Sequence, residues 1–316
     1  MKKLFYLFGL QGMTLMALAQ PGSYSALAIP DSLKKNADAV IRDEYIRFTI
    51  KDLNTAYYKV HEVITVLNTE GARYLDFDEF SYKFRVLDDA EIIVYDASGQ
   101  KKNTYSKKEM TSLNYGEGLV PEGKLTYFRV TAPSFPITVE INYTVKYKGL
   151  LSYPSNYFQS PYTSVQKAVF EVEAPADLSF RYKLLNCDYK PVITRNGNSE
   201  LYRWETKGLS AYKVEKHSGA ADNFIPQVIL GPNRFQLDDY EGDLTSWKNF
   251  GIWMNKLYEK TVGLPDEKKQ FYQGLVKNAT SDREKARILY QYMQNNMRYV
   301  SIQLGIGGLR PFPASF

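Results

Sequence analysis

Few residues in this chain are of the types that perform nucleophilic or metal chemistry. Its 316 residues include one cysteine and two histidines: Cys187, His61 and His217. A Cys–His pair would supply a thiolate nucleophile and its general base, and clustered His and Cys side chains would bind zinc. None of these residues has a partner at a recognisable motif spacing. The sequence therefore predicts no catalytic triad, no metal site and no cofactor site.

Two further motifs are compatible with ligand binding but favour ordinary structural roles. Gly305-Ile-Gly-Gly308 has no Lys-Ser/Thr and no helix after it, so it predicts a tight turn and no phosphate loop. The carboxylates of Asp238-Asp-Tyr-Glu-Gly-Asp243 lack the spacing of a calcium loop. We expect a solvated linker that also caps a helix beginning at Leu244.

The residues from about Ala39 to Thr206 have the pattern of successive β-strands. In Ile137–Lys148, apolar residues alternate strictly with polar ones, which places all the apolar side chains on one face. Many of the 26 tyrosines alternate with polar residues in the same way, as half-buried strand positions allow. The expected strands are 40–50, 57–67, 82–87, 91–95, 125–130, 137–148, 165–173, 180–185 and 201–206. Short strands separated by turn residues predict an antiparallel β-sandwich.

The pattern changes to helical after an irregular connection over residues 207–242. Trp247, Phe250, Met254 and Leu257 recur at three and four residues and predict one buried stripe.

Two further helices are expected. Pro265-Asp-Glu opens the first of them, which would bury Phe271 and Leu275. Ser281-Asp-Arg-Glu284 is a capping box for the second, which carries apolar residues on one face.

The N-terminus has the features of a secretory signal. Lys2 and Lys3 form a basic start, residues 4–18 are mostly apolar, and Ala17-Leu18-Ala19 matches the small-residue cleavage pattern. The apolar run is shorter than the roughly 20 residues that a retained membrane helix needs. We expect cleavage after Ala19 and an exported protein, periplasmic or extracellular, with no stable membrane span.

Charge and cysteine content restrict the classes of partner and of stabilisation. The formal net charge of +5 falls by two, to +3, when Lys2 and Lys3 are removed, so the sequence predicts no nucleic-acid partner. A single cysteine excludes an internal disulfide, so an exported fold must depend on its hydrophobic core.

Two parts of the chain resemble known families. Residues 247–258, 281–302 and 304–311, with the Arg298-Tyr-Val step, resemble the opening of a bacterial transglutaminase-like domain. The preceding strands resemble the domain of unknown function (family 3857) that stands before such domains in exported bacterial proteins. The pieces that match are Asn68-Thr-Glu-Gly71, Asp96-Ala-Ser-Gly99, the segment 133–148 and Tyr202-Arg-Trp204.

The resemblance implies an active-site motif that this sequence lacks. In the transglutaminase-like superfamily the lead-in turn is followed by Gly-Asp-Cys, and a His and an Asp further on complete a papain-like triad. No Gly-Asp-Cys is present, and Cys187 lies in the β region. We therefore expect a chain truncated before the catalytic Cys, with no catalytic residue of its own. Tyr299, Gln303 and Arg310 are expected to border the substrate groove.

The resemblance implies a function for the whole protein and a smaller one for this chain. The whole protein would perform Cys-dependent acyl transfer, either transamidation or amide hydrolysis, on a protein or peptide substrate. This chain would be an inactive part with an accessory or recognition β-domain. A complete, non-catalytic secreted binding module for glycan or protein remains the alternative.

The expected organisation has five parts, and the oligomeric state is left open. They are a signal peptide (1–19), a flexible leader (20–38), a β-sandwich domain (39–230), a linker (231–243) and the N-terminal part of a transglutaminase-like α+β domain (244–316). Residues from Leu309 to Phe316 are expected to be extended or poorly packed.

Overall fold

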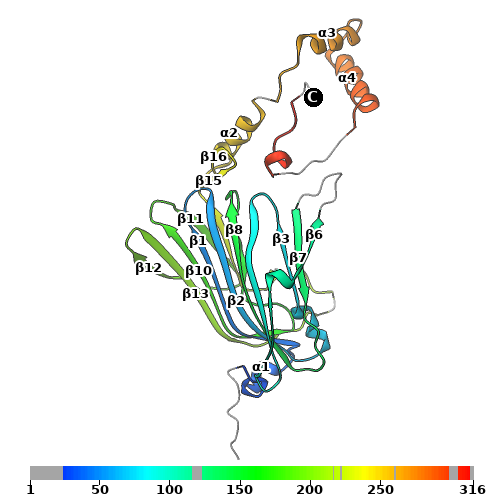
Figure 1. Cartoon of the computed structure of the whole chain (residues 1–316). Helices are drawn as coiled ribbons and strands as arrows, with labels where there is room; N and C mark the ends of the chain where they lie inside the picture. Colours follow the sequence, from blue (N-terminus) through cyan, green and yellow to red (C-terminus); the bar gives the residue numbers. More distant parts are fainter. Residues whose placement is uncertain are drawn as a thin grey trace, which may run out of the picture.

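The computed structural model describes residues 24–115, 123–215, 217–220, 223–259, 261–298 and 305–313. A β-rich region comes first, and the helices α2 (Trp247–Tyr258), α3 (Asp266–Leu275) and α4 (Asp282–Asn296) follow it (Figure 1). The predicted fold class, a β-rich N-terminal region followed by helices, is confirmed. The signal-peptide residues 1–19 lie outside the described ranges.

The largest element is a curved sheet of eight strands. Its strands are β1 (Ala39–Ile50), β2 (Thr55–Val66), β4 (Arg85–Tyr95), β5 (Lys101–Ser106), β8 (Ile137–Lys148), β10 (Thr163–Pro175), β12 (Val192–Asn196) and β13 (Ser199–Leu209). Their order is β12-β13-β10-β1-β2-β8-β4-β5. Neighbours are antiparallel except β1 and β10, which are parallel, so the sheet is mixed and not purely antiparallel as predicted. Alternation along a strand reports its buried face but not the direction of its neighbour.

Two small sheets cover one face of the large sheet. One contains β3 (Asp76–Ser81), β7 (Gly123–Arg129) and β6 (Thr111–Tyr115); the other contains β11 (Phe180–Leu185), β14 (Gln227–Pro232) and β9 (Asn156–Tyr157). The ring of Phe77 contacts Tyr143 at 5.5 Å, and the ring of Tyr182 contacts Trp204 at 5.3 Å. Both partners belong to the large sheet, so the region is a sandwich with a divided second layer. Short 3-10 turns, η2 (Thr69–Leu75) and η3 (Lys107–Glu109), connect its strands.

The main core lies between these layers and follows the alternation of the sequence. The segment with the strictest alternation is β8, with the predicted bounds. Its Val139 and Val145 are fully buried, as are Phe48, Phe170 and Trp204 on other strands of the same core. Cross-strand contacts between such side chains are the main source of sheet stability. The predicted strands 82–87 and 91–95 are joined into the single strand β4, which has a bulge between Leu87 and Asp89.

The segment expected to be a flexible leader is folded from Tyr24 onward. It forms η1 (Ala26–Ala28) and α1 (Asp31–Lys34), and Ile29 and Leu33 are buried against Val40. The buried guanidinium of Arg42 donates to the Ser25 carbonyl at 3.2 Å. The prolines and polar residues of this segment favoured the prediction of a flexible leader, although a few of its apolar residues are buried. Figure 1 shows α1 at the end of the sheet opposite to α2.

The connection expected to be irregular contains three strands. β14 is the middle strand of its small sheet, and β15 (Arg234–Leu237) pairs with β16 (Tyr240–Asp243) in a hairpin. Residues 238–239 form its two-residue turn, and Asp238 has a φ of +51°. Asp tolerates this left-handed conformation, so Phe-Gln-Leu followed by Asp-Asp was the hairpin signal in the sequence.

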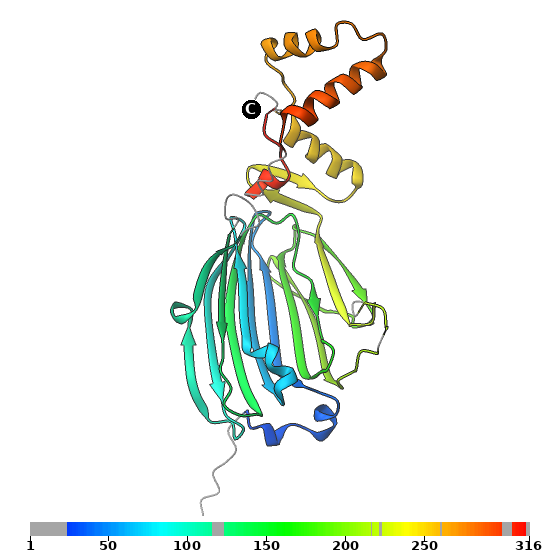
Figure 2. The ribbon, with the colours of Figure 1, turned by 90° about the vertical axis from the view of Figure 1, so that its right-hand side faces the viewer.

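The helices differ in how much they bury. In α2, Trp253 and Leu257 are buried, whereas α3 and α4 have no buried residue. The prediction that Phe271 and Leu275 are buried was wrong: they are 47% and 36% exposed. The apolar periodicity is present, but no described segment covers it. Phe271 instead contacts Tyr292 of α4 at 5.4 Å, and both helices project beyond the sheets (Figure 2).

The described C-terminal residues divide into a docked part and an exposed part. Gly305–Gly308 forms the short turn η5, and Ile306 is buried with Phe84 and Trp253. Residues 310–313 are exposed, as expected for this stretch, and Leu309 is half-buried. None of the helices in the described ranges has the length and apolar character that crossing a bilayer requires.

Candidate functional site

The helical end is attached to the sandwich through a second, smaller core. Phe235 and Leu237 of β15 pack with Trp253 and Leu257 of α2. The rings of Phe235 and Trp253 are 4.9 Å apart in an edge-to-face arrangement. Gly242 of β16 allows this contact, because a Cβ there would overlap both rings. This core holds the second half of α2 against the hairpin at the end of the sandwich.

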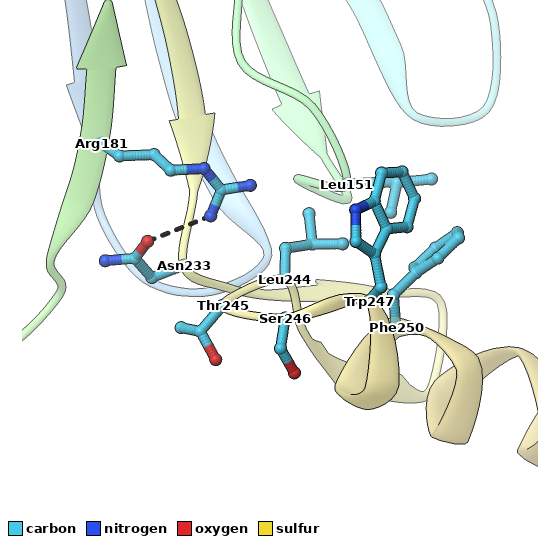
Figure 3. A pocket seen from close by; sticks show the side chains of 8 residues that line it. All are labelled: Leu151, Arg181, Asn233, Leu244, Thr245, Ser246, Trp247 and Phe250. Carbon is cyan, nitrogen blue, oxygen red and sulfur yellow. Dashed lines mark hydrogen bonds between the residues drawn. The ribbon is translucent and has the colours of Figure 1, made fainter.

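A pocket of about 590 Å³ lies beside this junction (Figure 3). It is lined by residues from β11, from the loops next to β8, β14 and β16, and from the first turn of α2. The lining residues are Leu151, Arg181, Asn233, Leu244, Thr245, Ser246, Trp247 and Phe250. Its volume is in the range of small-ligand and peptide side-chain pockets.

One wall of the pocket is apolar. Leu151, Leu244 and Phe250 are half-buried and pack against the second core. The Trp247 ring contacts Phe250 at 6.3 Å but remains 88% exposed, and it stands beside Leu151 in Figure 3. An exposed indole next to a packed apolar wall is a feature of binding surfaces.

The other wall is polar and carries a positive charge. Arg181 donates through Nη1 to the Pro232 carbonyl at 3.0 Å and to Asn233 Oδ1 at 3.1 Å. Asn233 in turn donates to Ser179 Oγ at 2.9 Å. These bonds fix the guanidinium in position across the pocket from Trp247 (Figure 3). Among the described lining residues, Arg181 has the only formal charge.

The floor between these walls is fixed by the cap of α2. Ser246 Oγ accepts from the Asn249 N–H at 3.1 Å. The Asp243 carboxylate accepts from the Thr245 hydroxyl and from its N–H, and these bonds, with the Thr245 hydroxyl first, lower the pKa of Asp243. Ser246 is therefore the N-cap, and the helix begins at Trp247, three residues after the predicted start at Leu244.

The arrangement suits binding and not covalent chemistry. None of the described lining residues is Cys, His, Asp or Glu, so the pocket provides no nucleophile–base pair. It offers an apolar surface at one end and a fixed guanidinium at the other. A carboxylate bound by Arg181 would form a charge-assisted hydrogen bond.

Of the three residues predicted to border a substrate groove, Arg310 is described by the structure and does not line this pocket. Arg310 is exposed and donates to the Tyr240 hydroxyl of β16 at 3.2 Å. Tyr299 and Gln303 lie outside the described residues. Their role as a groove border stays a prediction.

The chemically reactive residue types are dispersed, as their spacing predicts. Cys187 is a free, half-buried thiol whose sulfur lies 3.9 Å from the Gln227 carbonyl oxygen. His61 is on β2 in the middle of the large sheet, and His217 is in a loop with a φ of +69°. In the described part of the chain, no group of three or more His, Cys, Asp or Glu side chains gathers to hold a metal ion.

The sequence analysis missed the two most prominent residues of the pocket. Trp247 was assigned to the buried stripe of its helix, but it is exposed, and Trp253 takes the buried position against Phe235 of the hairpin. Arg181 lies on a strand among exposed residues, and its pairing with the distant loop at Asn233 left no local signal.

Comparison with solved structures gives a match that shows the fold. It is a crystal structure from Parabacteroides distasonis described as a "putative protease", with a TM-score of 0.64 and 14% identity. The match covers 86% of this chain and 53% of the other, so the chain spans about half the length of that protein.

Two further matches are too distant to support an argument. A "putative nutrient binding protein" from Legionella pneumophila has a TM-score of 0.30 and 12% identity, covering 82% of this chain and 94% of the other. An M1 zinc metallopeptidase from Deinococcus radiodurans has a TM-score of 0.30 and 8% identity, covering 71% and 54%. No curated protein matches the chain.

A protein-family model provides the assignment. The model of a domain of unknown function with a solved structure, DUF3857, matches residues 53–213. This range extends from the turn before β2 to the segment after β13 and includes most of the sandwich. The chain belongs to the DUF3857 family.

Proposed function

We propose that this chain is the recognition part of an exported protease-like protein. The observation that carries the proposal is the junction pocket, in which exposed Trp247 faces the fixed guanidinium of Arg181. The description of the Parabacteroides distasonis structure as a "putative protease" supports a peptide as the ligand. The fold likeness alone does not carry an activity.

The ligand in this proposal is an extended peptide with an apolar side chain next to a carboxylate. Trp247, Leu151 and Phe250 would cover the apolar side chain, and removal of its surface from water would supply most of the affinity. Arg181 would bind the carboxylate and set the direction of the peptide.

The chemistry in this proposal belongs to the whole transglutaminase-like protein. A thiolate at a helix N-terminus, with His as its base, would attack an amide carbonyl. The C–N bond would break, the amine or ammonia would leave with a proton from the His, and an acyl-enzyme would remain. An amine acceptor would give transamidation, and water would give hydrolysis. The proposal assigns none of these steps to Cys187.

Export is part of the same proposal. The basic start, the apolar run and the Ala-Leu-Ala pattern support cleavage after Ala19. Expression in a bacterial host with the native leader, followed by N-terminal sequencing of the secreted or periplasmic product, tests it. A retained Met1 in the cytoplasmic fraction would contradict it.

A peptide-binding experiment tests the recognition role. A library of labelled peptides, each with one apolar and one acidic residue, is titrated by fluorescence anisotropy. We expect Trp247→Ala and Arg181→Gln each to weaken binding by about tenfold or more, the range of interface residues that carry binding energy.

Arg234→Gln is the matched control. Arg234 is 61% exposed on the neighbouring β15, where it pairs with Glu241, and it does not line the pocket. If no peptide binds, or if all three variants bind as the parent does, the recognition role is wrong. Binding of a glycan or of a folded protein in place of peptides would instead support the alternative, a non-catalytic binding module.

A further inference from the structure

A second site candidate lies on the face of the large sheet opposite to the two small sheets. It is a hollow of about 400 Å³ formed over the neighbouring strands β1, β2, β8 and β4. Its side chains alternate with the core positions of these strands and therefore point away from the core. The polar residues that line it are Lys59, His61, Asp89, Glu91, Asn142 and Thr144.

A chain of hydrogen bonds fixes the histidine of this hollow. Tyr95 donates to Glu140 at 2.6 Å, and Asn142 Nδ2 donates to the other oxygen of the same carboxylate at 3.3 Å. A carboxylate only accepts, so the Asn142 carbonyl oxygen faces His61, whose Nδ1 lies 2.8 Å away. That oxygen can only accept, so Nδ1 of His61 carries the hydrogen. In neutral imidazole, Nε2 is then an acceptor.

The hollow combines donors with acceptors. The Lys59 ammonium donates, and the carboxylates of Asp89 and Glu91 accept. Two carboxylates against one ammonium disfavour an anionic ligand. An apolar ligand would strip water from these groups without replacing its hydrogen bonds. A neutral ligand with several hydroxyl groups meets neither penalty, because each hydroxyl both donates and accepts.

We infer that this hollow binds a neutral sugar unit. His61 Nε2 and the carboxylates accept from sugar hydroxyls, and Lys59 donates to them. The aromatic ring of Tyr45, which also lines the hollow, is held through a 2.5 Å bond from its hydroxyl to Glu171 and offers a wall for the sugar ring.

The central strands support this site without prior rearrangement. β1, β2 and β8 each have neighbours on both sides, so the side chains are mounted on a rigid backbone. Groups that are already fixed lose little conformational freedom on binding. The site is separate from the peptide pocket and does not depend on the proposed function.

Titration by saturation-transfer NMR and calorimetry tests the inference. The probes are a panel of neutral hexoses and pentoses, a sugar acid as the anionic arm, and neutral oligosaccharides and polysaccharides. We expect millimolar binding of at least one neutral sugar and weaker binding of the acid. A free sugar as the ligand gives equal affinity for monosaccharide and oligomer, whereas a glycan gives tighter binding of the oligomer.

Variants locate the binding site. His61→Ala and Lys59→Ala each should weaken binding by about three- to tenfold, as loss of one hydrogen bond implies. His61→Gln, whose amide oxygen also accepts, should lose less than His61→Ala. Lys207→Ala is the matched control, because Lys207 is 66% exposed and bound to Glu205 on β13, outside the hollow.

Unchanged circular dichroism and unfolding midpoints show that each variant is folded. No binding across the panel overturns the inference. The inference is also overturned if His61→Ala and Lys59→Ala leave the affinity unchanged, or if Lys207→Ala lowers the affinity as much as they do.

Discussion

The β region and the helical end of this chain differ in what surrounds their apolar residues. Strands far apart in the sequence enclose Phe48, Phe170 and Trp204, which are fully buried. In α4, by contrast, Tyr290 and Met293 are 58% and 44% exposed, although the helix has a regular apolar face. Both regions have the periodicity that predicts burial, but no segment in the described part of the chain covers the apolar face of α4 as the layers of the β region cover one another.

The two regions are therefore stabilised in different ways. The sandwich depends on long-range packing. By contrast, α4 begins with a local cap, the bond from the Glu284 N–H to Ser281 Oγ at 3.2 Å, and α3 contacts α4 through Phe271 and Tyr292. An apolar face without a cover marks a contact surface in soluble proteins. α2 stands between the two cases, because one side of it is buried in the second core and the other carries exposed Trp247.

Two tryptophans, one buried in the sandwich and one exposed on α2, test this difference most directly. Trp204 is fully buried and stacks on Phe170 at 5.7 Å, so Trp204→Ala should lower the free energy of unfolding by about 3–5 kcal/mol. Trp247→Ala, the exposed counterpart, should change it by no more than about 0.5 kcal/mol. Urea unfolding followed by circular dichroism measures both. Equal losses would mean that the helical end belongs to the same cooperative unit.

A buried carboxyl pair gives the β region its own pH dependence. Glu44, only 8% exposed, lies opposite Glu62 across β1 and β2. Burial first, and the charge of Glu62 second, raise the pKa of Glu44; burial raises the pKa of Glu62 from 4.5 to about 7, although the charge of His61 lowers it.

The sign follows from the unfolded state, which releases these protons at lower pH than the folded state. The contribution of this pair to the free energy of unfolding should therefore be greatest below pH 4.5 and fall, by roughly 1–3 kcal/mol, as pH rises to about 7. Thermal unfolding of the wild type and of Glu62→Gln between these values measures it, because the other titrating groups are common to both proteins. The stability of the wild type relative to Glu62→Gln should fall over this window, and a rise would contradict the assignment.

Two glycines test how tightly α2 packs at the junction with the sandwich. A Cβ on Gly242 would overlap Phe235 and Trp253, so Gly242→Ala should cost about 1–3 kcal/mol through overpacking. Gly251 lies in α2 with open space around it, so Gly251→Ala should stabilise by about 0.5–1 kcal/mol. Near-ultraviolet circular dichroism and urea unfolding report both changes. The same sign for the two variants would disprove a tightly packed junction.

The smallest expected effect is confined to the helical end. Ser281→Ala removes the N-cap of α4 and should destabilise that helix by about 1 kcal/mol. Amide hydrogen exchange should show faster exchange in residues 282–296 and no change in β8. Ser281→Asp, which keeps a capping oxygen, should restore protection. Loss of protection in the strands would show that α4 is coupled to the sandwich.

Much of the fold could be predicted because local patterns carry it. Strict alternation located β8, and its bounds are those predicted. Pro265 and Ser281 located the starts of α3 and α4. The hairpin of β15 and β16 was missed because the acidic residues around Asp238 suggested a solvated linker, although they also form its turn.

The candidate site could not be predicted in the same way. Arg181 and Trp247 are 66 positions apart in the sequence. They line the same pocket only because β14 and the hairpin bring α2 to the end of β11. A residue on an apolar helical stripe looks the same whether a partner covers it or not. Trp247 and Phe271 therefore looked like core residues.

The sequence by itself determined the β-to-helix order, the buried faces of the strands, the cap of α4 and the separation of its few reactive side chains along the chain. These properties depend on neighbours within a few positions along the chain. Only the tertiary structure decided that β1 and β10 pair in parallel, that Arg42 anchors the N-terminal segment, and that Trp253 is buried while Trp247 is free. Each of these depends on contacts between distant segments, and no local pattern records them.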